Sequence, residues 1–93
     1  MFVRLVQFTL SPKGRSQAQS MADELVSLIK QQPGCQSAVF YSDTGGVSGL
    51  FVLWDSQQHA DAAAEIVSPR LEAHLAGNVI APVERRLLPV LAN

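Results

Sequence analysis

The stretch LFVLWDS, residues 50 to 56, begins with five large apolar residues in succession and ends in two polar ones. A strand with one face in water alternates apolar and polar residues, so this unbroken run predicts a strand that is covered on both faces. The aspartate and serine that follow predict the end of the strand and the N-cap of a helix. The fold must therefore supply two covering layers for residues 50 to 54.

Three further strands are expected around this one. Residues 35–42 (CQSAVFYS) precede a turn sequence at 43–46, where the glycines adopt positive φ at little cost, so the two strands are predicted to form a hairpin. Residues 2–10 predict a strand that opens the chain, and residues 82–91 predict the last strand. Pro89 cannot donate a ladder hydrogen bond, which favours an edge position for the last strand.

Helical segments separate these strands. Residues 18–29 repeat apolar side chains at helical spacing, after SPKGR (11–15), which predicts a loop, and after a capping box of Ser16 and Gln19. The second helical segment follows residue 56 and is expected to break in two at Ser68-Pro69, because proline suits the first turn of a new helix.

The predicted order of elements is β-α-β-β-α-β, which indicates an α+β, ferredoxin-like fold with a four-stranded antiparallel sheet. The helices cover one sheet face only, and the other face is too apolar to remain in water. A second copy of the chain covers it most economically, so we expect a homodimer whose sheets pair into a dimeric α/β barrel. The alternative is a monomer whose open sheet stacks RNA bases, and a net charge of −1 disfavours it.

Length and composition limit the remaining classes. The 93 residues suit one domain spanning 1–93, and a charged fraction of 16% favours a buried interface. The single cysteine excludes a small disulfide scaffold. There is no signal sequence and no apolar run that could span a bilayer, so we expect a cytoplasmic protein without membrane or nucleic-acid partners.

Three segments together match a known family: QQPGCQSAVFYS, GLFVLWDSQQHADAA and SPRLEAHLAGNV. Pro33-Gly34 precedes the second strand, Trp54-Asp55-Ser56 closes the third, and His74 lies in a helix before the last strand. Across nearly the whole chain the sequence resembles the antibiotic biosynthesis monooxygenase family of dimeric α/β barrels. The resemblance implies an oxidoreductase that oxidises aromatic polyketides or quinols with dioxygen, without metal or flavin, at a site between the sheet and the helices.

Five residues are candidates for such a site. His74 and Tyr41 are the candidate catalytic residues, His74 as a general base and Tyr41 as a donor to a substrate carbonyl. Trp54, Gln7 and Arg86 are the candidate substrate-binding residues. Each also has a structural interpretation: a histidine with a surface hydrogen bond, aromatic side chains that pack on strands, a glutamine at the dimer interface, and an arginine in a salt bridge with Glu84 or Asp55.

The alternation of side chains along a strand leaves one choice open. Arg4 and Gln7 point to opposite faces of the sheet, as do Arg85 and Arg86, so only one of each pair can line the site. Cys35 has no adjacent basic residue and is expected to be an inert thiol. No carboxylate pair, metal cluster, phosphate loop or dinucleotide fingerprint is present, so no cofactor is expected.

Two alternatives to the monooxygenase hypothesis remain. One is a non-catalytic dimeric α/β barrel that binds a small aromatic ligand. The other is haem binding, because a related branch of the family degrades haem with a histidine on the corresponding helix, which here is His74. That branch has a tryptophan about ten residues earlier, where this chain has Ala64, so the resemblance to it is incomplete.

Overall fold

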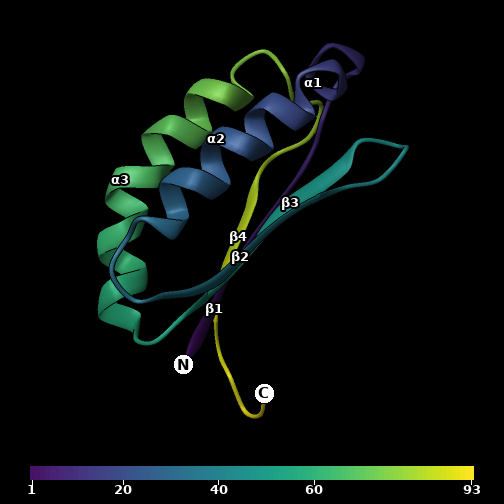
Figure 1. The fold of residues 1–93 in the computed structure, drawn as a ribbon. Helices are drawn as coiled ribbons and strands as arrows, with labels where there is room; N and C mark the ends of the chain where they lie inside the picture. Colours follow the sequence, from purple (N-terminus) through teal and green to yellow (C-terminus); the bar gives the residue numbers. More distant parts are fainter.

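The computed structural model describes residues 1–93 as a four-stranded antiparallel sheet with two long helices on one face (Figure 1). The sheet order is β2-β3-β1-β4, which confirms the α+β ferredoxin-like fold and the edge position of the last strand. The strands are β1 (Phe2–Thr9), β2 (Cys35–Ser42), β3 (Val47–Trp54) and β4 (Glu84–Pro89), and the helices are α1 (Pro12–Ser16), α2 (Ala18–Lys30) and α3 (Gln57–Leu75).

The apolar run of β3 separates into two sets of side chains. Leu50, Val52 and Trp54 point to the helices and are at most 3% exposed, whereas Phe51 between them is 43% exposed. The helices α2 and α3 lie on the same side of the sheet, so one chain covers only half of this strand. The prediction that the helices cover a single face is confirmed.

The start of the first helical region differs from the prediction. Residues 11–15 are not a loop, because α1 begins there with Ser11 as its N-cap, and the Gly14 N–H donates to the Ser11 hydroxyl at 3.1 Å. The capping box is also wrong: the Ser16 hydroxyl donates to the Lys13 carbonyl, and α2 begins at Ala18 with Gln17 as an N-cap that makes no side-chain hydrogen bond. The serine and proline of residues 11 and 12 form the favourable helix start.

The predicted break in the second helical region is wrong as well, because α3 continues through Pro69. A proline inside a helix costs about 3 kcal/mol. Val67, Leu71 and Leu75 form one buried stripe that passes Pro69, and burying each such side chain contributes roughly 1.5–3 kcal/mol, so packing outweighs the proline. The start of α3 is as predicted, since the Ser56 hydroxyl accepts a hydrogen bond from the backbone of His59.

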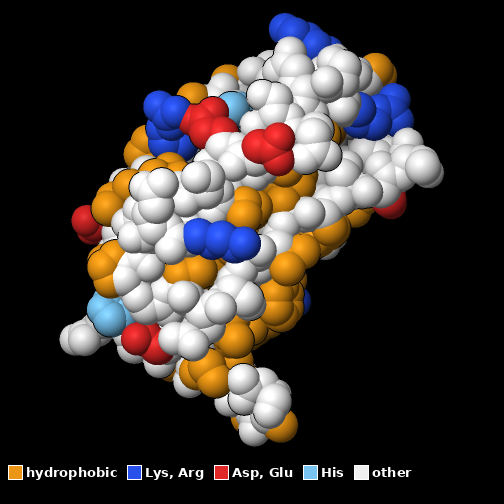
Figure 2. All heavy atoms as spheres, in the orientation of Figure 1, with side chains coloured by type: hydrophobic (Ala, Val, Ile, Leu, Met, Phe, Trp, Pro, Cys, Tyr) orange, Lys and Arg blue, Asp and Glu red, His pale blue; other side chains and the backbone are white.

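The face of the sheet opposite the helices, which we call the open face, carries exposed apolar side chains. Figure 2 shows hydrophobic side chains gathered along the sheet, at the lower right of the molecule. This surface belongs to strands, and none of the helices combines the length and hydropathy that crossing a bilayer requires. The large apolar side chains of the open face that are exposed are Val39, Val47, Phe51 and Leu88.

Candidate functional site

A cavity of about 180 Å³ lies between α3 and the sheet, and ten of its 13 lining residues are hydrophobic. The strand β3 contributes its buried side chains, and α3 contributes small ones, which leave space that larger side chains would fill. An apolar cavity of about 150 Å³ is sufficient for one benzene ring. The site therefore accommodates a single substituted aromatic ring. The small side chains from α3 are Ala60, Ala63, Ala64 and Ser68.

Two polar atoms of this lining are buried without a hydrogen-bond partner. They are the indole Nε1 of Trp54 and the guanidinium Nε of Arg4. A buried donor that lacks an acceptor costs about 1–3 kcal/mol. Both atoms belong to residues that line the cavity, and a ligand acceptor oxygen that reached either of them would remove this penalty.

The structure decides which arginines face the helices. Val6 on β1 pairs with Arg85 on β4, and Arg4 pairs with Leu87, so Arg4 and Arg85 share the covered face and line the cavity. Arg4 donates to the carboxylate of Asp61 on α3 at 3.1 Å. The guanidinium of Arg85 lies 3.6 Å from the carboxylate of Glu72, also on α3.

Gln7, Tyr41 and Arg86, three of the predicted site residues, lie on the open face. The Tyr41 hydroxyl donates to the amide oxygen of Gln7 at 3.1 Å, across Gly49 of the intervening strand. A Cβ at Gly49 would collide with the Tyr41 hydroxyl, so this glycine makes room for the ring. The sheet itself therefore separates these three side chains from Trp54, the one predicted site residue that lines the cavity.

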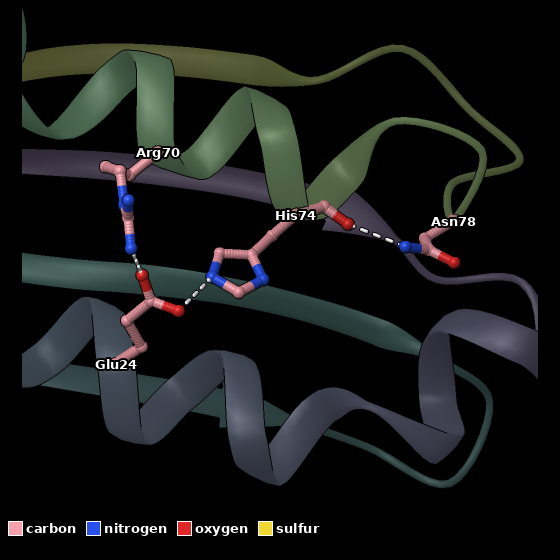
Figure 3. Close-up of polar contacts among 4 residues, drawn as sticks. All are labelled: Glu24, Arg70, His74 and Asn78. Atoms are coloured by element: carbon pink, nitrogen blue, oxygen red, sulfur yellow. Dashed lines mark hydrogen bonds and ion pairs between the residues drawn. The ribbon is translucent and has the colours of Figure 1, made fainter.

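His74 takes part in a polar cluster between α2 and α3 (Figure 3). Its Nε2 lies 2.8 Å from one carboxylate oxygen of Glu24, and the other oxygen accepts a hydrogen bond from Arg70. The backbone carbonyl of His74 accepts from the Asn78 amide at 2.7 Å. His74 is not among the residues that line the cavity, and its contacts join the two helices.

Two titratable groups, Asp55 and Cys35, have shifted pKa values. The hydrogen bond with the His59 ring, at 2.6 Å, lowers the pKa of the exposed Asp55 carboxyl. Burial raises the pKa of the Cys35 thiol, although the positive charge of Lys30 opposes this shift. The thiol therefore stays protonated at neutral pH, in keeping with the expectation that it is inert. No group of three or more His, Cys, Asp or Glu side chains is arranged to hold a metal.

Sequence reasoning named Gln7 as a site residue and left open which of Arg4 and Gln7 faces the site, although the sequence contains a signal that favours Arg4. Val6, Phe8 and Leu10 alternate with Arg4 along the same side of β1, and all three are at most 6% exposed. Gln7 shares its side with Thr9, which indicates the less apolar face. No comparable signal identifies Asp61 or Glu72, because their contacts depend on how α3 lies across the sheet.

Comparison with known proteins places this arrangement among solved folds. No family model and no curated protein matches the sequence. The structure of Rv0793 from Mycobacterium tuberculosis has a TM-score of 0.80 at 23% identity, over 99% of this chain and 96% of that chain. The crystal structure of an antibiotic biosynthesis monooxygenase has a TM-score of 0.83 at 17% identity, over 99% of this chain and 100% of that chain.

A third similar structure is a variant of SnoaB, a cofactor-independent oxygenase from Streptomyces nogalater. Its TM-score is 0.80 at 14% identity, over 99% of this chain and 94% of that chain. In all three cases the similarity extends over nearly the whole of both chains. This chain therefore has the fold of the antibiotic biosynthesis monooxygenases.

Proposed function

We propose that this protein is a cofactor-independent monooxygenase of the antibiotic biosynthesis monooxygenase family, acting on a small aromatic or quinol-type molecule in the cavity. The observation that carries the proposal is the pair of buried, unpartnered donors of Trp54 and Arg4 in a lining of which ten of 13 residues are hydrophobic. The fold supports the reaction class, since proteins with this fold include one named as an antibiotic biosynthesis monooxygenase and one as a cofactor-independent oxygenase.

The lining residues suit a substrate that ionises easily. No histidine or carboxylate lines the cavity, so the acidity of the substrate itself must supply the anion. The guanidinium of Arg4 and the indole N–H of Trp54 favour an anionic oxygen, because opposite charge and hydrogen bonding both stabilise the ionised form. An ionised quinol is electron-rich and is the species that reduces dioxygen.

The reaction balances without a further reductant. A single-ring quinol and dioxygen give a hydroxyquinone and water. One ring C–H bond and two phenolic O–H bonds break, one oxygen atom forms the new hydroxyl group, and the other leaves in water. The substrate supplies all four electrons that dioxygen takes up. The role of the protein is to hold the anion beside dioxygen in a site with little water.

Oxygen uptake with a panel of single-ring quinols tests this proposal. We expect protein-dependent consumption above autoxidation, with one atom of isotopically labelled dioxygen in the product. Trp54→Phe keeps an aromatic ring and removes the indole donor, and we expect it to lower kcat/KM by about 10-fold or more. Arg70→Gln, which removes a surface charge away from the cavity, is the matched control. Uptake no faster than autoxidation with every quinol would remove the catalytic claim.

A non-catalytic binding protein is the second candidate. It is favoured by the absence of any lining side chain that could accept a proton. It predicts that aromatic molecules bind in the cavity and that no oxygen is consumed. We do not extend the proposal to haem, because His74 lies outside the cavity and contacts Glu24.

The proposal includes a homodimer that forms through the open face. The exposed apolar side chains of this face come from β2, β3 and β4, and a stable interface needs about 800 Å² from each partner. We expect sedimentation at micromolar concentration to give twice the chain mass of 10.0 kDa. Phe51→Asp should give particles of 10.0 kDa, whereas Ile66→Asp, at an exposed apolar position on α3, should not. A wild-type protein that sediments only as single chains would contradict the dimer.

A further inference from the structure

We propose that the ligand of this cavity carries an anionic oxygen at one end, and that Arg4 and Arg85 select it at the rim. The inference rests on the proposed function, because it concerns the ligand of the same cavity. It adds the guanidinium of Arg85 to that of Arg4 and widens the ligand class from ionised quinols to aromatic rings that carry any anionic oxygen, carboxylates included.

Two ion pairs between the sheet and α3 carry the inference. Arg4 contacts Asp61 at 3.1 Å and Arg85 contacts Glu72 at 3.6 Å. The side chains of the two arginines are 24% and 39% exposed, whereas those of the two carboxylates are 58% and 65% exposed. Both arginines line the cavity and neither carboxylate does. The positive charges thus lie between the cavity and solvent, with their negative partners farther out in water.

These ion pairs leave donors available to a ligand. The contact of Arg85 with Glu72 is longer than a hydrogen bond, and no side-chain hydrogen bond of Arg85 is present. Arg4 uses one terminal nitrogen, Nη2, for Asp61, and its other terminal nitrogen makes no hydrogen bond. Because exposed ion pairs contribute little to stability, an anion at the rim can replace Asp61 or Glu72 at low cost.

The charged side chains that line the cavity determine whether it prefers an anionic or a cationic ligand. The cavity lining contains two guanidinium groups and no carboxylate, so the charged groups nearest to a ligand favour an anion over a cation. A ligand oxyanion at the rim is less exposed to water than the carboxylates it replaces, and its attraction to an arginine is therefore stronger. The planar fork of an arginine also matches a carboxylate with two parallel hydrogen bonds. A ring carboxylate and a ring phenolate share the required chemistry.

Calorimetric titration with matched probes tests the inference. We expect para-ethylbenzoate to bind about 10-fold or more tightly than its uncharged isostere para-ethylbenzamide, as hydrogen bonds to charged groups imply. Added salt should weaken binding of the benzoate and leave the benzamide unchanged. Quenching of the single tryptophan, Trp54, places the probe in the cavity. Titration with para-nitrophenolate, at a pH where it is ionised, separates phenolate from carboxylate recognition.

Variants assign the selection to the two arginines. Arg85→Gln lies on an edge strand and should reduce benzoate affinity to that of the benzamide, as should Arg4→Gln if it folds. Glu72→Gln removes the competing carboxylate and should raise benzoate affinity roughly two- to fivefold, the range that an exposed ion pair allows. Arg70→Gln, which breaks an ion pair away from the cavity, should change neither affinity.

Two kinds of result would overturn the inference, and only the second would also contradict the proposed ligand site. Equal affinity for benzoate and benzamide, or unchanged benzoate affinity in Arg85→Gln, would remove anion selection and leave the cavity as an aromatic site. Failure of every probe to bind would remove both anion selection and the proposed ligand site.

Discussion

The two faces of the sheet differ in whether their polar side chains have hydrogen-bond partners. On the covered face the donors of Trp54 and Arg4 are buried beside a cavity and lack partners. On the open face Tyr41 and Gln7 donate and accept between themselves, although solvent is near. A buried donor without an acceptor lowers the free energy of unfolding, and a ligand that supplied an acceptor would remove this penalty. The contrast supports the proposals that a ligand binds on the covered face and that a second copy packs on the open face.

The largest expected effect is a difference in unfolding free energy between substitutions at two neighbouring residues of β3. Leu50→Ala should lower the free energy of unfolding by about 2–5 kcal/mol at any protein concentration, because Leu50 is 2% exposed in the core of each chain. Phe51→Ala should destabilise only at concentrations where the dimer forms, since its side chain lies on the open face. Urea unfolding over a range of protein concentrations measures both. A loss for Phe51→Ala that does not change with dilution would contradict the assignment of this face.

A smaller effect is expected at the centre of the open face. A Cβ at Gly49 would collide with the Tyr41 hydroxyl and with the Val6 carbonyl, so Gly49→Ala should cost about 1–3 kcal/mol. Gly45→Ala is the matched control, because its nearest contact is an ordinary 3.4 Å and its φ is not positive. Thermal unfolding compares the two variants. Equal melting temperatures would show that the Tyr41 ring does not depend on the space at Gly49.

A smaller effect on stability is expected when the hydrogen bond between Tyr41 and Gln7 on the open face is removed. Tyr41→Phe removes the bond to Gln7 and should cost about 0.5–1.5 kcal/mol, because one neutral, exposed hydrogen bond is lost. Ligand affinity in the cavity should not change, since the sheet lies between. Chemical unfolding and calorimetric titration of the same preparation measure the two quantities. A loss of ligand affinity in Tyr41→Phe would show that Tyr41, on the open face, influences the cavity on the covered face.

The smallest effect concerns Asp55, which follows β3 at the edge of both faces. Its folded pKa is lowered by the His59 ring, so the stabilising contribution is present above the ordinary carboxyl range and is lost as the pH falls through the folded pKa. Carboxyl carbon NMR titration should place the pKa of Asp55 below its ordinary value in the wild type. In His59→Ala the pKa should rise toward that value, and an unchanged pKa would rule out His59 as the cause.

Much of the fold could be predicted from local patterns. The strands, the hairpin and the cap at Ser56 follow from side-chain alternation and turn chemistry, which act between near neighbours. The two errors in the helices have local and non-local causes. The helix start at Ser11 was a local signal that sequence reasoning gave to Ser16. The passage of α3 through Pro69 depends on a buried stripe that only packing against the sheet creates.

The candidate site was less predictable than the fold. Trp54 was singled out and lines the cavity, but Gln7, Tyr41 and Arg86 lie across the sheet from it, and His74 contacts Glu24 instead. Side-chain type identified residues with useful chemistry. It carried no information about which of them converge, because convergence depends on contacts between residues far apart in the chain.

The sequence by itself determined that Arg4 and Gln7 occupy opposite faces and that two helices cover one face, because the period of a strand and the length of the chain allow nothing else. Only the tertiary structure decided that a cavity remains beneath the alanines of α3 and that Trp54, Arg4 and Arg85 meet there. The physical reason is that the volume between a helix and a sheet, and the hydrogen-bond partners within it, are set by packing between distant segments.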